Sequence, residues 1–176
     1  MKRAINVPQT NIPFWKIALI VFISLLIHTF LNPAGCLIYP IDDPTPAPDC
    51  DLTDAALAGA DLRGADFQNA NLAGANLSKA DLSQRPLEKR TLSTNFESAN
   101  LKKTNLSDAK LNGANFLNAF LRDTNLEGAD LTGASFSSAN LKGANLKGAK
   151  MEGAKLEGAK LCNTVMPDGS VNDSGC

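Results

Sequence analysis

Residues 60–84 read ADLRG ADFQN ANLAG ANLSK ADLSQ, a repeat of five residues with Leu or Phe at its third position. The same spacing places Leu, Phe or Met at every fifth residue from Leu52 to Leu82 and again from Phe96 to Met166. The 22 central residues are 16 Leu, four Phe and two Met; two places before the centre stand 17 Ala, four Thr and one Cys. One small and one large apolar side chain therefore recur together throughout this region.

A period of five fits neither a helix nor a flat strand. In an α-helix, five residues advance about 140° beyond a full turn, so the central residues would spiral over every face. In a strand, an odd spacing would send alternate centres to opposite faces. The pattern therefore predicts a backbone that turns a corner once per repeat, with both apolar positions directed at one axis. Asn, Asp and Gly, which tolerate corner conformations, occupy the remaining positions.

The number of repeats in one coil follows from residues that recur every 20 positions. Phe96, Phe116 and Phe136 are spaced by 20 residues, and Thr104 and Thr124 share this spacing. Stacked parallel coils place like residues on like, so one coil is predicted to hold four repeats. Coils that rise by about 4.8 Å make a rod of roughly 27 Å between Cys50 and Cys162. Its core should be filled, without a ligand-sized cavity.

Repeats such as Ala60–Gly64 and 144–148, of the form A(D/N)LxG, resemble those of the pentapeptide-repeat family. The resemblance covers residues 50–166 and implies an all-β fold, a right-handed quadrilateral parallel β-helix. The chain is similar to cyanobacterial members exported to the periplasm or the thylakoid lumen. A further branch of the family mimics DNA and binds gyrase. Residues 50–166 depart from that branch, because they carry 13 acids and 14 bases, and nucleic acid is not expected as a partner.

The N-terminal segment is typical of export. Basic residues precede the uncharged run 17–31, IALIVFISLLIHTFL, so residues 1–35 are predicted to form an apolar signal or membrane-anchor helix. Pro33 to Cys36 reads PAGC, which resembles a lipoprotein box except that Pro replaces the usual Leu. Cleavage, lipidation and retention in the membrane all remain open. The Pro-rich residues 36–50 are predicted to be a linker or an N-terminal cap.

The repeat region is assigned to residues 51–166, followed by a C-terminal cap tail at 167–176, and it is interrupted once. Leu82 and Phe96 are 14 residues apart, which is not a multiple of five. A continued frame would aim Arg85 and Arg90 at the core, where unpaired charge costs several kcal/mol, and Pro86 would remove a ladder donor. Residues 83–95 are therefore predicted to leave the rod as a loop, either passive or used in recognition.

Four cysteines lie at the two ends of the predicted rod. Cys50 and Cys162 are too far apart to pair, because a disulfide requires Cα atoms within about 7 Å. We predict the local pairs Cys36–Cys50 and Cys162–Cys176, each of which would hold a tail over one end of the rod. Lipidation of Cys36 is the alternative, and it would leave Cys50 free.

Two features of the outward surface are candidate contacts. Lys102, Arg122 and Lys142 each follow a centre and are 20 residues apart, so they should form a basic column. This column is either a solvated edge or a contact for an anionic partner. Leu117 and Phe120 are apolar at outward positions and are candidates for a dimer or partner contact. In the loop, Arg85, Pro86 and Arg90 are candidate contacts.

The composition does not favour catalysis. The chain has a single histidine, His28, which lies in the apolar run, so no catalytic residue, metal site or cofactor is expected. The sequence predicts a non-enzymatic scaffold in an exported compartment, with a protein partner or a second copy of the chain. The alternative is an envelope spacer attached to a membrane through the N-terminal segment.

Overall fold

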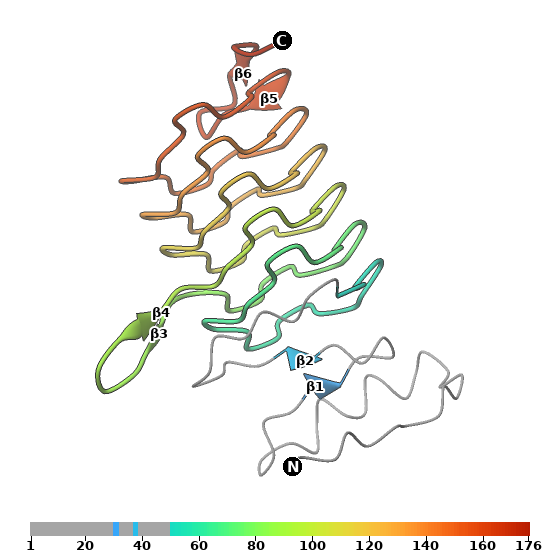
Figure 1. The fold of residues 1–176 in the computed structure, drawn as a ribbon. Coiled ribbons are helices and arrows are strands. Elements are labelled where there is room, and N and C mark those ends of the chain that lie inside the picture. The colour runs from blue at the N-terminus through green and yellow to red at the C-terminus, as the bar shows by residue number, and fades with distance from the viewer. Residues whose placement is uncertain (1–29, 32–36, 39–49) are drawn as a thin grey trace.

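A computed structural model describes residues 30–31, 37–38 and 50–176. Residues 50–176 form a stack of similar coils with the C-terminus at one end (Figure 1). Parallel bridges join residues one coil apart, as in the series Asn95, Asn115, Ser135 and Lys155. Partners in this series are 20 residues apart, and successive centres are five residues apart. One coil therefore holds four repeats, as the recurrence of Phe and Thr predicts.

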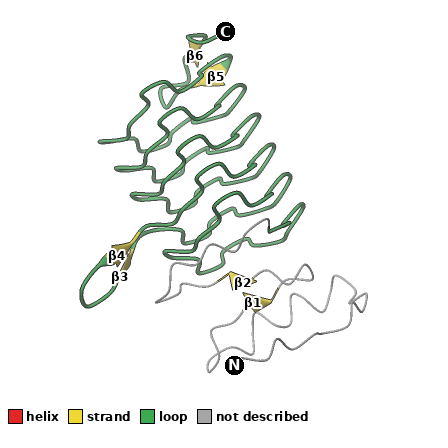
Figure 2. Ribbon diagram, viewed as in Figure 1, coloured by secondary structure: helices red, strands yellow, loops and turns green. Residues whose placement is uncertain are grey.

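The hydrogen bonds between coils are made at the centre, at the residue before it and at the corner residues that follow it. The amide of Leu121 donates to the carbonyl of Asn140 in the next coil at 2.8 Å, and Asn140 donates back to Ala119 at 2.9 Å. Corner residues separate these short pairings. The described part of the chain consequently contains few named strands and no helix, and Figure 2 shows the rod almost entirely as loops and turns.

The described residues form six strands of two residues each, in three antiparallel pairs. They are β1 Phe30–Leu31 with β2 Leu37–Ile38, β3 Arg85–Pro86 with β4 Thr91–Leu92, and β5 Thr164–Val165 with β6 Val171–Asn172. The β1–β2 and β3–β4 pairs lie outside the regular parallel ladder of single bridges, whereas β5 also belongs to that ladder through the bridge between Asn145 and Val165. In the β5–β6 pair, the C-terminal tail folds back onto the last coil.

Nearly every corner has a left-handed backbone at the second residue after the centre. Gly fills this position in many repeats, with φ of 70° at Gly143, and Asp123 occupies it one coil earlier with φ of 57°. The Asp123 carboxylate leans over Gly143, so a Cβ there would collide with it. Asp108 and Gly128 form the same arrangement on another side. Glycine favours this φ, which Asp123 shows that other residues also adopt, and it is needed at Gly128 and Gly143 for the space beside an aspartate.

The core is a column of side chains along the rod axis. Phe67, Phe96, Phe116 and Phe136 stack in order with ring centroids 5.0, 4.9 and 4.7 Å apart and planes within 8° of parallel. The 20-residue spacing in the sequence predicts that the last three of these rings stack. Phe67 joins the stack at a spacing of 29, which the repeat alone does not reveal.

Threonine replaces alanine in the core without leaving an unpaired hydroxyl. The Thr104 hydroxyl donates to the carbonyl of Leu72 at 2.7 Å, and the Thr124 hydroxyl donates to the carbonyl of Leu101 at 2.6 Å. Thr164 makes the equivalent bond to Leu141 at 2.8 Å. Throughout the described residues, no buried side-chain nitrogen or oxygen lacks a hydrogen-bond partner. The buried polar atoms of the core are therefore all hydrogen-bonded, as a core without water requires.

The interruption between Leu82 and Phe96 is a hairpin that leaves the rod (Figure 1). Across it, bridged partners such as Asp81 and Lys110 are 29 residues apart instead of 20, so nine residues are added to one coil. Thr94 is fully buried at the small-residue position, so the frame has resumed there. The excursion is therefore residues 85–93, narrower than the predicted 83–95.

The C-terminal tail is fastened to the last coil. Cys162 and Cys176 form a disulfide with Cα atoms 4.7 Å apart, the local pairing expected from the sequence. The amide of Leu161 donates to the carbonyl of Ser174 at 3.0 Å, so the tail continues the ladder over part of the rod end. At the other end Cys50 is also disulfide-bonded. Its predicted partner, Cys36, lies outside the described residues.

Of residues 1–35, predicted to form a signal or anchor helix, the structure describes only residues 30–31. Phe30–Leu31, the last residues of the apolar run, form β1 and not the end of a helix. Their pairing with β2 ties the run to the Pro-rich segment, which the sequence treats as separate. The rest of the predicted signal or anchor helix lies outside the described residues. Within the described ones, the structure has no helix long and apolar enough to span a membrane.

A bulky side chain at a small-residue position should destabilise the rod. Ala134 is fully buried, and we expect Ala134→Leu to lower the free energy of unfolding by ~1–3 kcal/mol through overpacking. Ser137→Leu is the matched control, because Leu117 occupies the equivalent outward position one coil earlier. Thermal or urea unfolding measures both variants. Equal unfolding curves for the two would contradict the inward assignment of Ala134.

Candidate partner-binding surface

The side of the rod that carries the centres Leu101, Leu121, Leu141 and Leu161 is here called the basic side. Its segments 99–103, 119–123, 139–143 and 159–163 contain five bases and one acid. The bases are Lys102, Lys103, Arg122, Lys142 and Lys160, and all are exposed. The sequence predicted the column of Lys102, Arg122 and Lys142, and the three-dimensional register adds Lys103 and Lys160.

Backbone hydrogen bonds hold the predicted basic column in register. The amide of Lys103 donates to the carbonyl of Arg122, and the amide of Asp123 donates to the carbonyl of Lys142, both at 2.9 Å. Three like charges therefore stand on three successive coils. Asp123 offsets part of this charge, with its Oδ2 atom 3.5 Å from Nε of Arg122. At such exposed positions the repulsion is on the order of 1 kcal/mol or less per neighbouring pair.

The opposite side of the rod arranges its charges differently. One outward column there runs Asp61, Asp81, Lys110, Asp130 and Lys150, with both signs present. Arg63 contacts Asp61 at 2.8 Å, and Lys110 contacts Asp81 at 3.0 Å. The side-chain hydrogen bonds from Arg63 lower the pKa of Asp61. The hydroxyl of Thr132 likewise lowers the pKa of Asp130. Charges on the opposite side are thus compensated locally, whereas most of those on the basic side are not.

Phe120 interrupts an asparagine ladder on the basic side. Its column continues through Asn71, Asn100 and Asn140 in neighbouring coils. The Asn100 amide nitrogen donates to Oδ1 of Asn71 at 2.9 Å, and Asn100 Oδ1 accepts from the amide of Lys102 at 3.2 Å. A phenyl ring can make neither bond.

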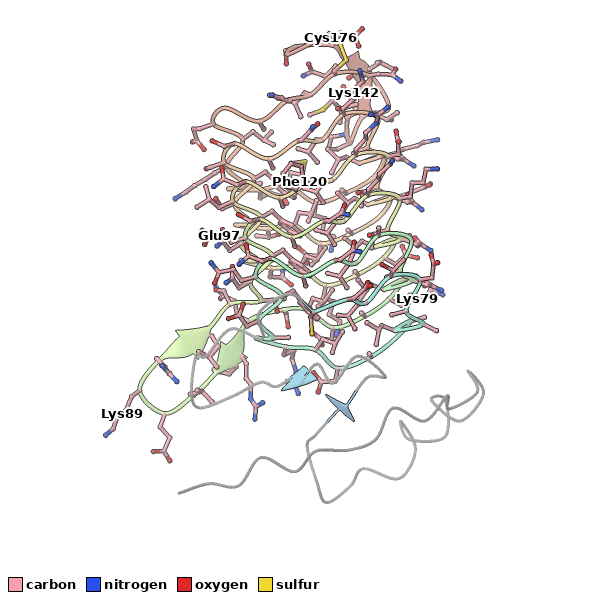
Figure 3. All side chains as sticks on the ribbon, turned by 45° about the vertical axis from the view of Figure 1, so that its right-hand side comes forward. Lys79, Lys89, Glu97, Phe120, Lys142 and Cys176 are labelled. Carbon is pink, nitrogen blue, oxygen red and sulfur yellow. A yellow bond between two sulfur atoms is a disulfide. The ribbon has the colours of Figure 1, made fainter. Side chains whose placement is uncertain are left out.

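The Phe120 side chain is 54% exposed and is one of two exposed large apolar residues in the described chain. Figure 3 shows Phe120 midway along the rod, below Lys142 and above Glu97. Leu117 lies at the preceding corner and is half-buried. The amide of Ser98 donates to its carbonyl at 2.9 Å, which places it in the column above Glu97. Phe120 is thus the prominent apolar group of the basic side.

The hairpin is a second outward feature and lies away from the basic column. Arg85 and Pro86 form β3, and Glu88, Lys89 and Arg90 are exposed near its tip. Figure 3 shows Lys89 at the far end of the projection. The loop candidates and the surface candidates therefore belong to two separate surfaces.

The repeat region matches the family model described as pentapeptide repeats, at residues 49–84, 93–128 and 129–166. The chain belongs to the pentapeptide repeat family. Proteins of this family form right-handed quadrilateral β-helices and are generally non-enzymatic scaffolds for protein interactions. The unmatched residues between the first two segments are those of the hairpin.

Solved structures similar to this chain are also pentapeptide repeat proteins. Rfr23 from the cyanobacterium Cyanothece 51142 is 33% identical, with a TM-score of 0.60 over 66% of this chain and 88% of that one. A protein of the Arabidopsis thaliana thylakoid lumen is 28% identical, with a TM-score of 0.36 over 66% of this chain and 72% of that one. No curated protein matches the chain in sequence.

The described residues show no metal-binding cluster, since no three His, Cys, Asp or Glu side chains come together among them. The outward columns instead offer charge and one aromatic ring on a convex surface. Such a surface suits contact with another macromolecule.

Phe120→Asn should repair the ladder of the basic side. The new amide would join Asn100 to Asn140 and would accept the Arg122 amide, at the loss of a half-buried phenyl ring. We expect the free energy of unfolding to rise by about 0.5 kcal/mol, because ~0.5–1.5 kcal/mol per hydrogen bond outweighs the lost burial. Urea unfolding measures this change. Asn100→Phe, the reverse change one coil away, should destabilise the rod.

The rod should fold without its hairpin. Deleting residues 85–93 restores a spacing of five between Leu82 and Phe96, and Gln84→Gly supplies the left-handed corner. We expect the unfolding free energy to stay within about 1 kcal/mol of the parent, since shortening a surface loop has little entropic consequence. Circular dichroism and thermal unfolding test this. Loss of the folded signal would show that the hairpin is part of the rod's own structure.

Proposed function

We propose that this protein is a non-enzymatic scaffold that binds a protein partner in an exported compartment. The observation that carries the proposal is the filled interior of the rod. Central side chains such as Leu121 and Phe136 are fully buried, and the small residues between them are buried as well. Sequence variation is therefore available only at outward positions, where a partner would make contact.

The hairpin at residues 85–93 is the first candidate element for that contact. It adds nine residues to one coil and carries exposed charged side chains near its tip. The ladder hydrogen bonds on both sides of the insertion are intact, as in Asp81 to Lys110. Segments that project from a rigid scaffold commonly carry recognition.

Export is supported by the cysteines and the N-terminus. Disulfides persist in oxidising compartments, and the chain has the Cys162–Cys176 bond together with a bonded Cys50. The apolar run 17–31 after basic residues has the composition of a secretory signal. We place the protein in a periplasm or a thylakoid lumen.

A second candidate function is an envelope spacer held at a membrane. The apolar run 17–31 and the PAGC sequence ending at Cys36 favour it. Membrane fractionation separates a released rod from an attached one, and mass spectrometry of the Cys36 peptide identifies a lipid. A thioether-linked lipid would leave Cys36 no sulfur for the predicted disulfide with Cys50.

The scaffold proposal is tested by affinity capture from the exported fraction, using the parent chain and the 85–93 deletion with Gln84→Gly. We expect a specific protein partner to be retained by the parent and reduced or lost with the deletion. Equal capture by both would indicate that the partner contacts the sides of the rod and not the hairpin. Capture of no protein by either, in the exported fraction and its membranes, would contradict the scaffold function.

A further inference from the structure

We propose that the basic side binds an acidic α-helical segment of a partner protein, laid along the rod axis with Phe120 as the apolar anchor. The inference rests on the proposed scaffold function and deepens it by naming a surface and a class of partner. It is independent of the hairpin, which lies on a separate surface.

The excess of positive charge on the basic side favours an acidic partner. Five exposed bases and one acid occupy four stacked segments, although the opposite side shows that the same repeat accommodates mixed and paired charge. Among the described residues, Asp123 is the one carboxylate that forms an ion pair with the column of Lys102, Arg122 and Lys142. A partner carboxylate placed beside this column would relieve the repulsion between its members.

The spacing of the column favours a helix over an extended strand. Coils rise by about 4.8 Å, whereas a helix rises about 5.4 Å per turn, so acids on one helix face stay within about 1.2 Å of register over two coil steps. Same-side residues of a strand are about 6.8 Å apart, which puts them about 4 Å out of register over the same distance. Flexible Lys and Arg side chains accommodate the first mismatch more readily than the second.

Phe120 provides the apolar part of the contact. Phe120 is 54% exposed, and it lies two residues before Arg122 on the same side of the rod. An exposed aromatic surrounded by charges is a common centre for a protein interface. Leu117, half-buried at the preceding corner, extends the apolar surface. An apolar residue one turn from a carboxylate on the partner helix would cover the ring.

An anionic membrane fits this side less well than a protein segment. A flat lipid surface would meet Asp123 among the bases, and it would extend beyond the basic side to the exposed Asp51 and Asp54 of the first coil. Interfacial membrane binding also depends on several inserted apolar side chains. Along the described basic side, Phe120 is the single exposed large one. A protein helix can avoid the acids and be oriented by them.

The experiment measures binding of the full chain to a labelled, alanine-based helical peptide. Its glutamates are alternately four and three residues apart, about one per helical turn, with leucines beside them. Fluorescence anisotropy at low salt should show micromolar binding that weakens as salt is raised. Phe120→Asn should weaken binding about tenfold. Lys102→Ser, Arg122→Ser and Lys142→Ser should each weaken it about two- to fivefold. Lys147→Ser, at the same corner position on the next side, should leave binding unchanged.

Three results would overturn the inference. They are no binding at low salt, equal binding of a peptide with the same composition in scrambled order, and tighter Phe120-dependent binding to phosphatidylglycerol vesicles than to the peptide. Because Phe120→Asn repairs a ladder, its unfolding curve separates lost contact from lost folding. If the peptide fails while affinity capture still retains a partner, the scaffold function stands and this assignment of the surface falls.

Discussion

The structure depends on the narrow space inside each coil. Coils stack so closely that the phenylalanine rings are 4.7–5.0 Å apart, and each repeat therefore has room for one large and one small side chain. This constraint forces the chain to turn within five residues. Nearly every corner therefore has a left-handed residue, as at Gly143 and Asp123. Hydrogen bonds between coils follow from the same geometry, because stacking brings equivalent amides and carbonyls together at the centres and at the corners.

A filled interior leaves chemistry to the outward columns, and a column acquires its properties by stacking. Asparagine makes a self-bonding ladder, as Asn100 does with Asn71. Acids and bases on the opposite side form compensated pairs such as Lys110 with Asp81. The basic side follows neither rule, because it stacks like charges and replaces one ladder asparagine with Phe120. These departures lower local stability and make this side chemically distinct from the others.

Much of this architecture could be predicted from residue types alone. The inward direction of the centres, four repeats per coil, and the departure of Arg85 and Pro86 from the rod all follow from the period of five and the chemistry of buried charge. The predicted loop was too wide at both ends, because Thr94 and Asn95 already occupy repeat positions. The apolar N-terminal run was assigned to a helix throughout, whereas Phe30–Leu31 form a strand.

The sequence by itself determined which side chains point to the axis, because direction is a local property of a backbone that turns every five residues. Only the tertiary structure decided which residues are neighbours across the hairpin, where the spacing of 20 that predicted the basic column does not hold. A column joins residues 20 positions apart, and 29 apart across the hairpin, so the partner of Phe67 is Phe96. The broken ladder at Phe120, the pairing of Asp81 with Lys110 and the extension of the basic side to Lys160 depend on this register. Contacts between coils are set by stacking, and a nine-residue insertion shifts every one that crosses it.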